Sequence, residues 1–255
     1  MPITFTQTEL ISIQHDVSAH LSVLPSAVDS FMEEHIFDSA HYRIMLDGEY
    51  AGFTSVHKAN LLTQFVLFPQ FRQHGQAIFA QAKRLDHVQA AFVPTCDELY
   101  LAHALDHYKQ MHKQAYFFAT PHDFVPQPVT EYQLQLATSD DIDFITANSG
   151  DFFGDVVPWI EQNKILLTMR DAECVGFGVM EKGRLINNIA SIGMFVIERF
   201  RQHGVGTATI RLLLQHCIAQ NLRPIAGCWY YNHTSKKTLE RAGMYTQTRL
   251  LKVEF

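Results

Sequence analysis

The stretch Arg201-Gln202-His203-Gly204-Val205-Gly206 is the part of the sequence from which the fold is best predicted. It follows the apolar run 187–197 and precedes residues 205–221, where apolar side chains recur every three or four positions, as on one face of a helix. We therefore expect a strand, a glycine-containing turn and a helix. Glycine permits close backbone approach, and the first amides of a helix lack partners within it, so this turn is a candidate site for phosphate oxygens.

The chain repeats itself around this stretch. The pentapeptide Phe-Arg-Gln-His-Gly occurs at 71–75 and again at 200–204. Strand-like apolar runs precede each copy, and a helical pattern, a strand, a second helix and a closing strand follow it. A proline-rich segment between the two halves is typical of an extended linker. We predict two related α/β (α+β) domains, at 1–124 and 132–255 with a linker at 125–131, each with a mixed, mostly antiparallel sheet flanked by helices.

The composition argues against several classes of function. A hydrophobic content of 47% suits a chain that buries a sizeable core, and a net charge of −6 argues against a nucleic-acid surface. No apolar stretch of about 18 residues or more is present, so no membrane span is expected, and no signal peptide is recognised. Four widely spaced cysteines favour reduced thiols in the cytoplasm over disulfides or zinc. His103 and His107 have helical spacing but no third ligand, so we expect no metal site.

The second half resembles the GNAT superfamily of acyl-CoA N-acyltransferases. Residues 201–206 match the family's central motif, Arg/Gln-x-x-Gly-x-Gly/Ala, which follows a splayed strand. Asn232, Ser235 and Gly243-Met244 match its next signature, an Asn after the following strand, then a small residue, then a Gly-apolar pair. The first half fits the loop pattern at 72–77 but lacks the later signature. The resemblance therefore implies tandem GNAT-like domains with a degenerate N-terminal copy.

The resemblance implies that acetyl-CoA binds to the second half, while the first half is a scaffold that shapes the acceptor site or the domain interface. Phe195 and Val196 would lie at a bulge in the splayed strand and bond the pantetheine arm. The amides of 202–207 would hold the diphosphate, and Arg201 would either add charge-assisted bonds or support the loop. The implied cofactor-binding residues are Phe195, Val196, Arg201, Gln202, His203, Gly204, Val205, Gly206, Thr207, Asn232 and Ser235.

The proton donor to the leaving thiolate is not assigned by the resemblance. Many family members carry a Tyr where this chain has Leu239, which has no proton to donate. The candidate catalytic residues nearby are Ser235, Tyr230 and Tyr231, with Cys228 as a further one, and the alternative is a thiolate that leaves unassisted. Because neighbouring residues of a strand face opposite sides, one of the two tyrosines is expected in the core.

A general base is likewise not assigned. Asp155 and Glu161 are candidates to accept a proton from the ammonium group, although a solvated loop face is the favoured interpretation of both. Phe152, Phe153 and Trp159 in the same segment either line an acceptor pocket or pack beneath a helix. Packing is the favoured interpretation of these three rings.

The predicted function is transfer of an acetyl group from acetyl-CoA to a primary amine, on a small molecule or a peptide, by direct attack. Two alternatives stay open: a non-catalytic acyl-CoA-binding or assembly module, which Leu239 favours, and a transferase of a different acyl group. Specificity in this family lies in variable loops, so the sequence does not identify the acceptor. A monomer and a homodimer are both compatible with the sequence.

Overall fold

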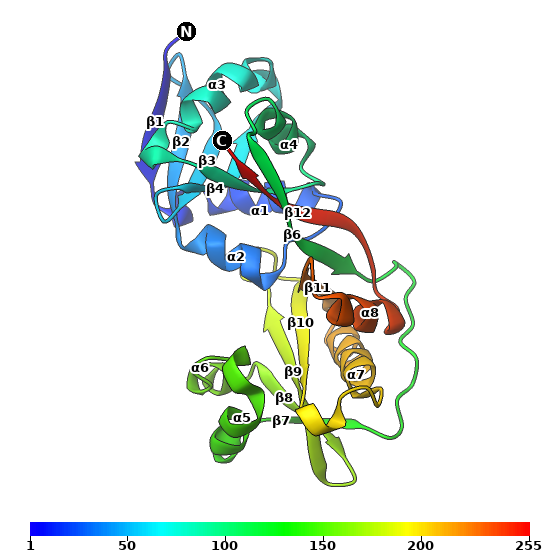
Figure 1. Cartoon of the computed structure of the whole chain (residues 1–255). Coiled ribbons are helices and arrows are strands. Elements are labelled where there is room, and N and C mark those ends of the chain that lie inside the picture. Colours follow the sequence, from blue (N-terminus) through cyan, green and yellow to red (C-terminus); the bar gives the residue numbers. More distant parts are fainter.

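The computed structural model describes residues 1–85 and 87–255 and shows an elongated molecule built around one continuous sheet (Figure 1). In these residues the sheet has 12 strands, in the order β1-β2-β3-β4-β5-β12-β6-β11-β10-β9-β8-β7. Neighbouring strands are mostly antiparallel, and β4–β5 and β10–β11 are parallel pairs. The strands are β1 (Ile3–Thr8), β2 (Ser39–Leu46), β3 (Glu49–His57), β4 (Leu61–Leu67), β5 (Ala90–Pro94), β6 (Gln110–Ala119), β7 (Gln133–Leu136), β8 (Ile165–Arg170), β9 (Glu173–Lys182), β10 (Ile189–Val196), β11 (Arg223–Trp229) and β12 (Tyr245–Glu254).

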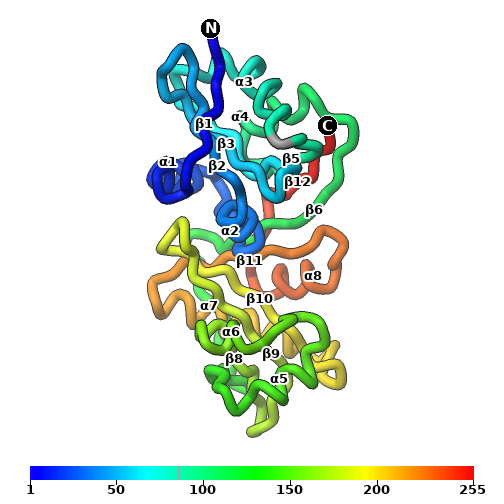
Figure 2. The backbone as a smooth tube through the Cα atoms, turned by 90° about the vertical axis from the view of Figure 1, so that its left-hand side faces the viewer, coloured from blue at the N-terminus to red at the C-terminus, as the bar shows by residue number. Residues whose placement is uncertain are grey.

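Helices cover both faces of the sheet in each half. In the first half, α3 and α4 bury apolar side chains on one face, and α1 and α2 do so on the other. In the second half, α7 and α8 cover one face, and α5 and α6 cover the opposite one. Figure 2 shows α2 at the waist of the molecule, beside β11. The helices are α1 (Gln14–Val23), α2 (Ser30–Phe37), α3 (Gly75–Ala82), α4 (Glu98–Leu105), α5 (Ile142–Ser149), α6 (Val157–Glu161), α7 (Val205–Ala219) and α8 (His233–Arg241).

The two halves exchange their closing strands. β6, the last strand of the first half, pairs with β11 of the second half, where Ala119 lies opposite Ile225. β12, the last strand of the second half, pairs with β5 of the first half, where Leu250 lies opposite Pro94. β6 and β12 also pair with each other, so they form one antiparallel ribbon that runs through both halves (Figure 1). The buried side chains of Leu250 and Val253 thereby complete the cores of the first half.

The fold class predicted from the sequence is confirmed, since the structure is a mixed α/β fold with a large, mostly antiparallel sheet flanked by helices. The exchange of closing strands was not predicted. A local apolar pattern indicates that a segment is a strand but does not indicate which strand it will join. The division at 1–124, 125–131 and 132–255 therefore stays a prediction about chain segments, and the β6–β12 ribbon crosses between them.

Candidate active site

The second copy of the pentapeptide forms an exposed turn at the start of α7. Gln202 and Gly204 have left-handed backbones, with φ of 67° and 82°, and Gly204 is the N-cap residue of the helix. Because a helical amide donates to the carbonyl four residues earlier, the amides of Val205, Gly206 and Thr207 have no such partner within α7. Left-handed turns and helix N-termini both direct N–H groups toward bound anions. The turn is therefore a candidate cradle for phosphate oxygens.

The first copy of the pentapeptide has a different conformation. It lies in a 3-10 segment, Pro69–His74, and Gly75 begins α3 with a right-handed φ of −55°. The Gly75 amide donates to the carbonyl of Arg72, so it is used within the turn. A Cβ added to Gly75 would collide with the imidazole of His103 on α4. Glycine is thus needed here for packing, which supports the interpretation of the first half as the degenerate copy.

Arg201 ties the second turn to the end of β10. Its Nε donates to the carbonyl oxygen of Val196 at 3.2 Å, and its guanidinium lies 5.5 Å from the centre of the Phe195 ring. Two roles were expected for Arg201, and these contacts correspond to support of the loop. The prediction of a bulge at Phe195 and Val196 is wrong where β10 pairs with β9. The register of this strand pair is unbroken from Ala190 to Val196. The irregularity lies one strand further, between β9 and β8.

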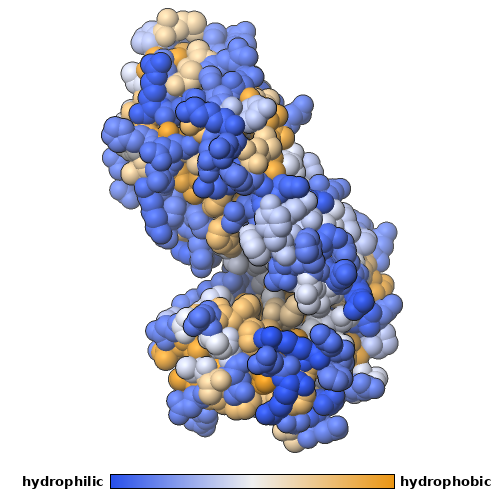
Figure 3. All heavy atoms as spheres, viewed as in Figure 1, coloured by the Kyte–Doolittle hydropathy of each residue, from blue (hydrophilic) through white to orange (hydrophobic). Residues whose placement is uncertain are grey.

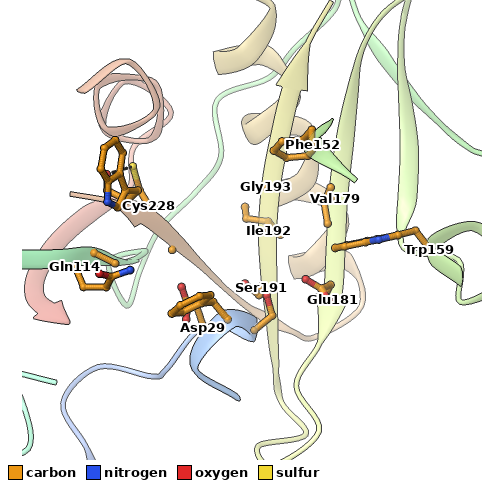
Figure 4. Close-up of a pocket in the computed structure, with 15 residues that line it drawn as sticks. Asp29, Gln114, Phe152, Trp159, Val179, Glu181, Ser191, Ile192, Gly193 and Cys228 are labelled. Atoms are coloured by element: carbon orange, nitrogen blue, oxygen red, sulfur yellow. Dashed lines mark hydrogen bonds between the residues drawn. The ribbon is translucent and has the colours of Figure 1, made fainter. Parts of the chain in front are cut away.

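β10 and β11 diverge and open a cavity between the two halves. The two strands pair only where Ile189–Ser191 lies beside Arg223–Ile225. Beyond this point a cavity of about 300 Å³ is lined by β6, β9, β10, β11, the start of α2 and the segment that carries Phe152 and Trp159 (Figure 4). The space-filling view shows the molecule hollowed at this waist (Figure 3). Residues of both halves therefore form one site.

The corresponding opening in the first half is filled. β4 and β5 also pair over a short stretch, Leu61–Leu62 beside Ala90–Ala91, and then separate. Buried side chains of α1 and α2, among them Leu21 and Met32, occupy the space between them. The cavity left there is about 10 Å³, the volume that one water molecule needs. Of these two openings between diverging strands, the one between β10 and β11 has room for a substrate and the one between β4 and β5 does not.

Asp29 is the buried carboxyl group of the cavity. It is 6% exposed, and its Oδ1 accepts a hydrogen bond from the amide of Met32 at 3.0 Å, which caps α2. Its Oδ2 lies against Gly227 of β11, where an added Cβ would collide with it. Desolvation by burial raises the pKa of Asp29 from 3.8 to about 6, and the negative charges of Glu181 and Glu34 act in the same direction.

The free energy of unfolding should fall as Asp29 ionises. Between pH 3.8 and about 6 the folded state binds more protons here than the unfolded chain does, so stability is lost as the pH rises through this window. The loss is about 3 kcal/mol, because one pKa unit corresponds to about 1.36 kcal/mol. Asp29→Asn, which preserves a helix cap, should be more stable than the wild type at neutral pH and lose this advantage in acid. Urea unfolding of both proteins checks this, and a difference independent of pH would contradict it.

The expected proton donors lie at the end of β11 and the start of α8. The Tyr230 ring stacks on Tyr116 of β6 at 4.6 Å, and hydrogen bonds with Tyr116 and Lys113 lower the pKa of Tyr230. The ring of Tyr231 is exposed, so of the two tyrosines Tyr230 is the one packed against the core. Leu239 is 2% exposed within the core beneath α7 and α8.

Asn232 and Ser235 are held by the start of α8. The Oδ1 of Asn232 accepts a hydrogen bond from the amide of Ser235 at 3.0 Å, so Asn232 is the N-cap of this helix. The hydroxyl of Ser235 is hydrogen-bonded to the thiol of Cys228, and burial raises the pKa of that thiol. These contacts give Asn232 a clear structural role, and its predicted part in binding acetyl-CoA stays a prediction.

In the segment before β8, some aromatic side chains pack in the core and others line the cavity. Phe153 is 6% exposed in the core, as the favoured interpretation predicted, whereas Phe152 and Trp159 border the cavity. Asp155 is exposed and accepts a hydrogen bond from the amide of Val157, and Glu161 is also exposed. Neither carboxylate lines the cavity. The cavity carboxylates are instead Asp29 and Glu181, which the sequence pattern did not single out.

Two further expectations concern metals and membranes. Across residues 1–85 and 87–255, the structure holds no group of three or more His, Cys, Asp or Glu side chains placed to bind a metal ion. Within the same residues, no helix has both the length and the apolar character needed to cross a bilayer.

Comparison with known proteins defines the class. A family described as "Acetyltransferase (GNAT) domain" matches residues 9–121, and one described as "Acetyltransferase (GNAT) family" matches residues 134–244. The chain therefore belongs to the GNAT acetyltransferase family and contains two such domains in tandem. This membership supports acyl transfer as the class of reaction.

Solved structures share the tandem fold. A GNAT-family acetyltransferase from Colwellia psychrerythraea is similar over 100% of both chains, with a TM-score of 0.85 and 19% identity. A GCN5-related N-acetyltransferase from Sphaerobacter thermophilus is similar over 99% of this chain and 95% of its own, with a TM-score of 0.66 and 12% identity. A tandem GNAT protein from the clavulanic acid biosynthesis pathway is similar over 99% and 98%, with a TM-score of 0.65 and 13% identity. No curated protein matches the sequence.

Proposed function

We propose that this chain is an N-acetyltransferase that moves an acetyl group from acetyl-CoA to a primary amine on a small molecule or a peptide, by direct attack. The observation that carries the proposal is the position of the glycine turn. It directly follows β10, whose divergence from β11 opens the cavity, and it begins α7. A donor held at the turn would therefore have its reactive end close to the cavity.

The turn fits the diphosphate of acetyl-CoA. Gly204 has no side chain to cover the first amides of α7, so these amides are accessible to an anion. The positive end of this 15-residue helix also favours anions. Gly206 packs closely against its neighbours, since an added Cβ would lie 3.3 Å from the Thr238 side chain and 3.4 Å from that of Val196. The pantetheine arm would run from the turn toward the splayed strands. Acetyl-CoA supplies the activated acyl group, and the residues of the chain hold and orient it.

The cavity suits an amine that carries an apolar group. Its carboxylates, Asp29 and Glu181, attract a cation, and aromatic rings of Phe152, Trp159 and Trp229 border the same space. Aromatic faces bind ammonium groups and apolar groups alike. These surroundings support a cationic acceptor with an apolar neighbour and disfavour an acidic one.

The test is thiol release from acetyl-CoA with a panel of primary amines and N-terminal peptides. Amine-dependent release with formation of the N-acetyl product supports the proposal. Donor binding without turnover across the panel would instead support a non-catalytic acyl-CoA-binding module, which the buried Leu239 favours. The same panel with longer acyl-CoA donors distinguishes acetyl transfer from transfer of a different acyl group.

Tyr230→Phe should reduce kcat by about 100-fold, the usual scale for a lost proton donor, without changing the Kd for acetyl-CoA. A phenol whose pKa is lowered gives its proton to a leaving thiolate more readily, and the hydrogen bonds to Tyr230 lower its pKa. Tyr231→Phe is the matched control, because that ring is exposed and should affect kcat little. Steady-state kinetics with the best amine of the panel measures both. Equal effects of the two substitutions would reject Tyr230 as the donor.

A further inference from the structure

We propose that Asp29, a residue of the first half, accepts the proton of the amine that reacts in the second half. This inference rests on the proposed function, because it assigns a role within amine acetylation. It also gives the degenerate half a chemical task in addition to its structural one. The two family matches place Asp29 in one domain and the glycine turn in the other.

The position of the carboxyl group carries the proposal. Asp29 precedes α2, which lies at the waist beside β11, and the side chain lines the cavity (Figures 2 and 4). Oδ1 is occupied by the amide of Met32, whereas Oδ2 lies against the backbone of Gly227. A glycine at 227 is what permits this approach. Next to Asp29, the hydroxyl of Ser30 donates to that of Ser191 on β10 at 3.3 Å, so the start of α2 contacts both diverging strands.

A structural role alone does not account for a carboxyl group at this position. Asn and Ser cap helices about as well as Asp does, and neither would become charged inside the molecule. Burial holds the pKa of Asp29 at about 6, so at neutral pH the group is an ionised carboxylate kept in a costly environment. Such a group, placed in a cavity, is well matched to accept a proton near neutral pH.

The neighbouring carboxylates are engaged elsewhere. Glu181 of β9 forms an ion pair with Lys164 at 3.0 Å. Glu33 of α2 accepts hydrogen bonds from the amides of Arg184 and Leu185 at 2.9 and 2.6 Å, and so links the two halves. Glu34, also on α2, contributes negative charge that favours a protonated Asp29. Gln114 of β6 also lines the cavity.

The proton balance of the reaction is then complete. The Asp29 carboxylate takes one proton from the ammonium group, which leaves a neutral amine with a free lone pair. The amine nitrogen forms a bond to the acetyl carbon, and the carbon–sulfur bond breaks. Tyr230 gives its proton to the thiolate and regains one from the second proton of the new amide nitrogen, and Asp29 returns its proton to solvent. The products are the N-acetyl amine, the thiol of CoA and one proton.

The experiment compares the wild type with Asp29→Asn on two amines that differ in basicity. Benzylamine is protonated at neutral pH and needs a proton acceptor, whereas aniline is neutral and does not. For the wild type, kcat/KM with benzylamine should rise with pH through the pKa of Asp29, near 6. In Asp29→Asn the levelling-off above pH 6 should be lost, because only the neutral fraction of benzylamine then reacts and this fraction grows steadily with pH. At neutral pH kcat/KM should fall by about 100-fold, while the rate with aniline and the Kd for acetyl-CoA change by less than about threefold.

Two control variants separate Asp29 from other carboxylates. Glu161→Gln alters an exposed residue outside the cavity and should leave the pH profile as in the wild type. Glu181→Gln removes the other cavity carboxylate and should retain the rise but shift it to lower pH, because the negative charge of Glu181 raises the pKa of Asp29. The proposal is overturned if Asp29→Asn keeps the wild-type profile, if both amines slow equally, or if Glu181→Gln abolishes the rise. A wild type that binds acetyl-CoA but acetylates neither these two amines nor any other amine of the panel would reject the proposed function itself, and the role of Asp29 with it.

Discussion

Replacing Gly204 by valine should weaken acetyl-CoA binding by about 100-fold or more while the protein stays folded. Gly204 has a φ of 82°, and a β-branched residue is a strong outlier there, so the turn would rearrange and misdirect its amides. Loss of two charge-assisted hydrogen bonds at about 1.5 kcal/mol each corresponds to roughly that factor. No atom lies within 4 Å of an added Cβ, so the core is not disturbed. Calorimetric titration and thermal unfolding measure the two effects separately.

Gly75→Ala is the matched control in the first copy of the pentapeptide, and it should behave in the opposite way. Its added methyl group collides with His103, and overpacking of a core costs about 1–3 kcal/mol. The variant should therefore lower the free energy of unfolding and leave the Kd for acetyl-CoA unchanged. If Gly75→Ala weakened acetyl-CoA binding while Gly204→Val did not, the assignment of the donor site to the second half would be wrong.

Removing residues 245–255 should abolish cooperative folding of both halves. β12 lies between β5 and β6, so its loss leaves two strand edges unpaired and removes Leu250 and Val253 from the cores of the first half. The intact chain should unfold in a single transition, since each half depends on a strand of the other. Urea unfolding followed by circular dichroism measures both chains.

Deletion of residues 1–8 is the control for this truncation. β1 is also a terminal strand, but it lies at the outer edge of the sheet and pairs with β2 alone. This shorter chain should be less stable than the intact one and still unfold cooperatively. A chain that lacks 245–255 and yet unfolds like the control would show that the strand exchange is dispensable.

The glycine turn and its helix could be predicted because their signal is local. The apolar stripe of 205–221 and the glycines at 204 and 206 together predict a helix that begins at a glycine turn. The structure has this helix, with Gly204 as its N-cap residue. The identical pentapeptide at 71–75 could not be interpreted in the same way. It is followed by Gln76-Ala77, and its glycine packs against His103, a contact between residues distant in sequence. Tertiary packing thus decided the conformation of the first copy.

The position of Asp29 in the cavity could not be predicted from the sequence. Its pattern, an Asp before a short amphipathic segment, indicates a helix cap and nothing more. Its importance arises from burial and from the contact with Gly227, and both depend on how the two halves are joined. The candidate bases Asp155 and Glu161 lie in the second half, whereas Asp29, the buried carboxyl group of the cavity, comes from the first.

The central claim is that one chain holds one donor, at the glycine turn of its second half. Calorimetric titration of the full-length protein with acetyl-CoA tests this most directly. We predict one acetyl-CoA bound per chain in the wild type and in Gly75→Ala, and loss of that binding in Gly204→Val. Two molecules bound per chain, or undiminished binding by Gly204→Val, would contradict the account.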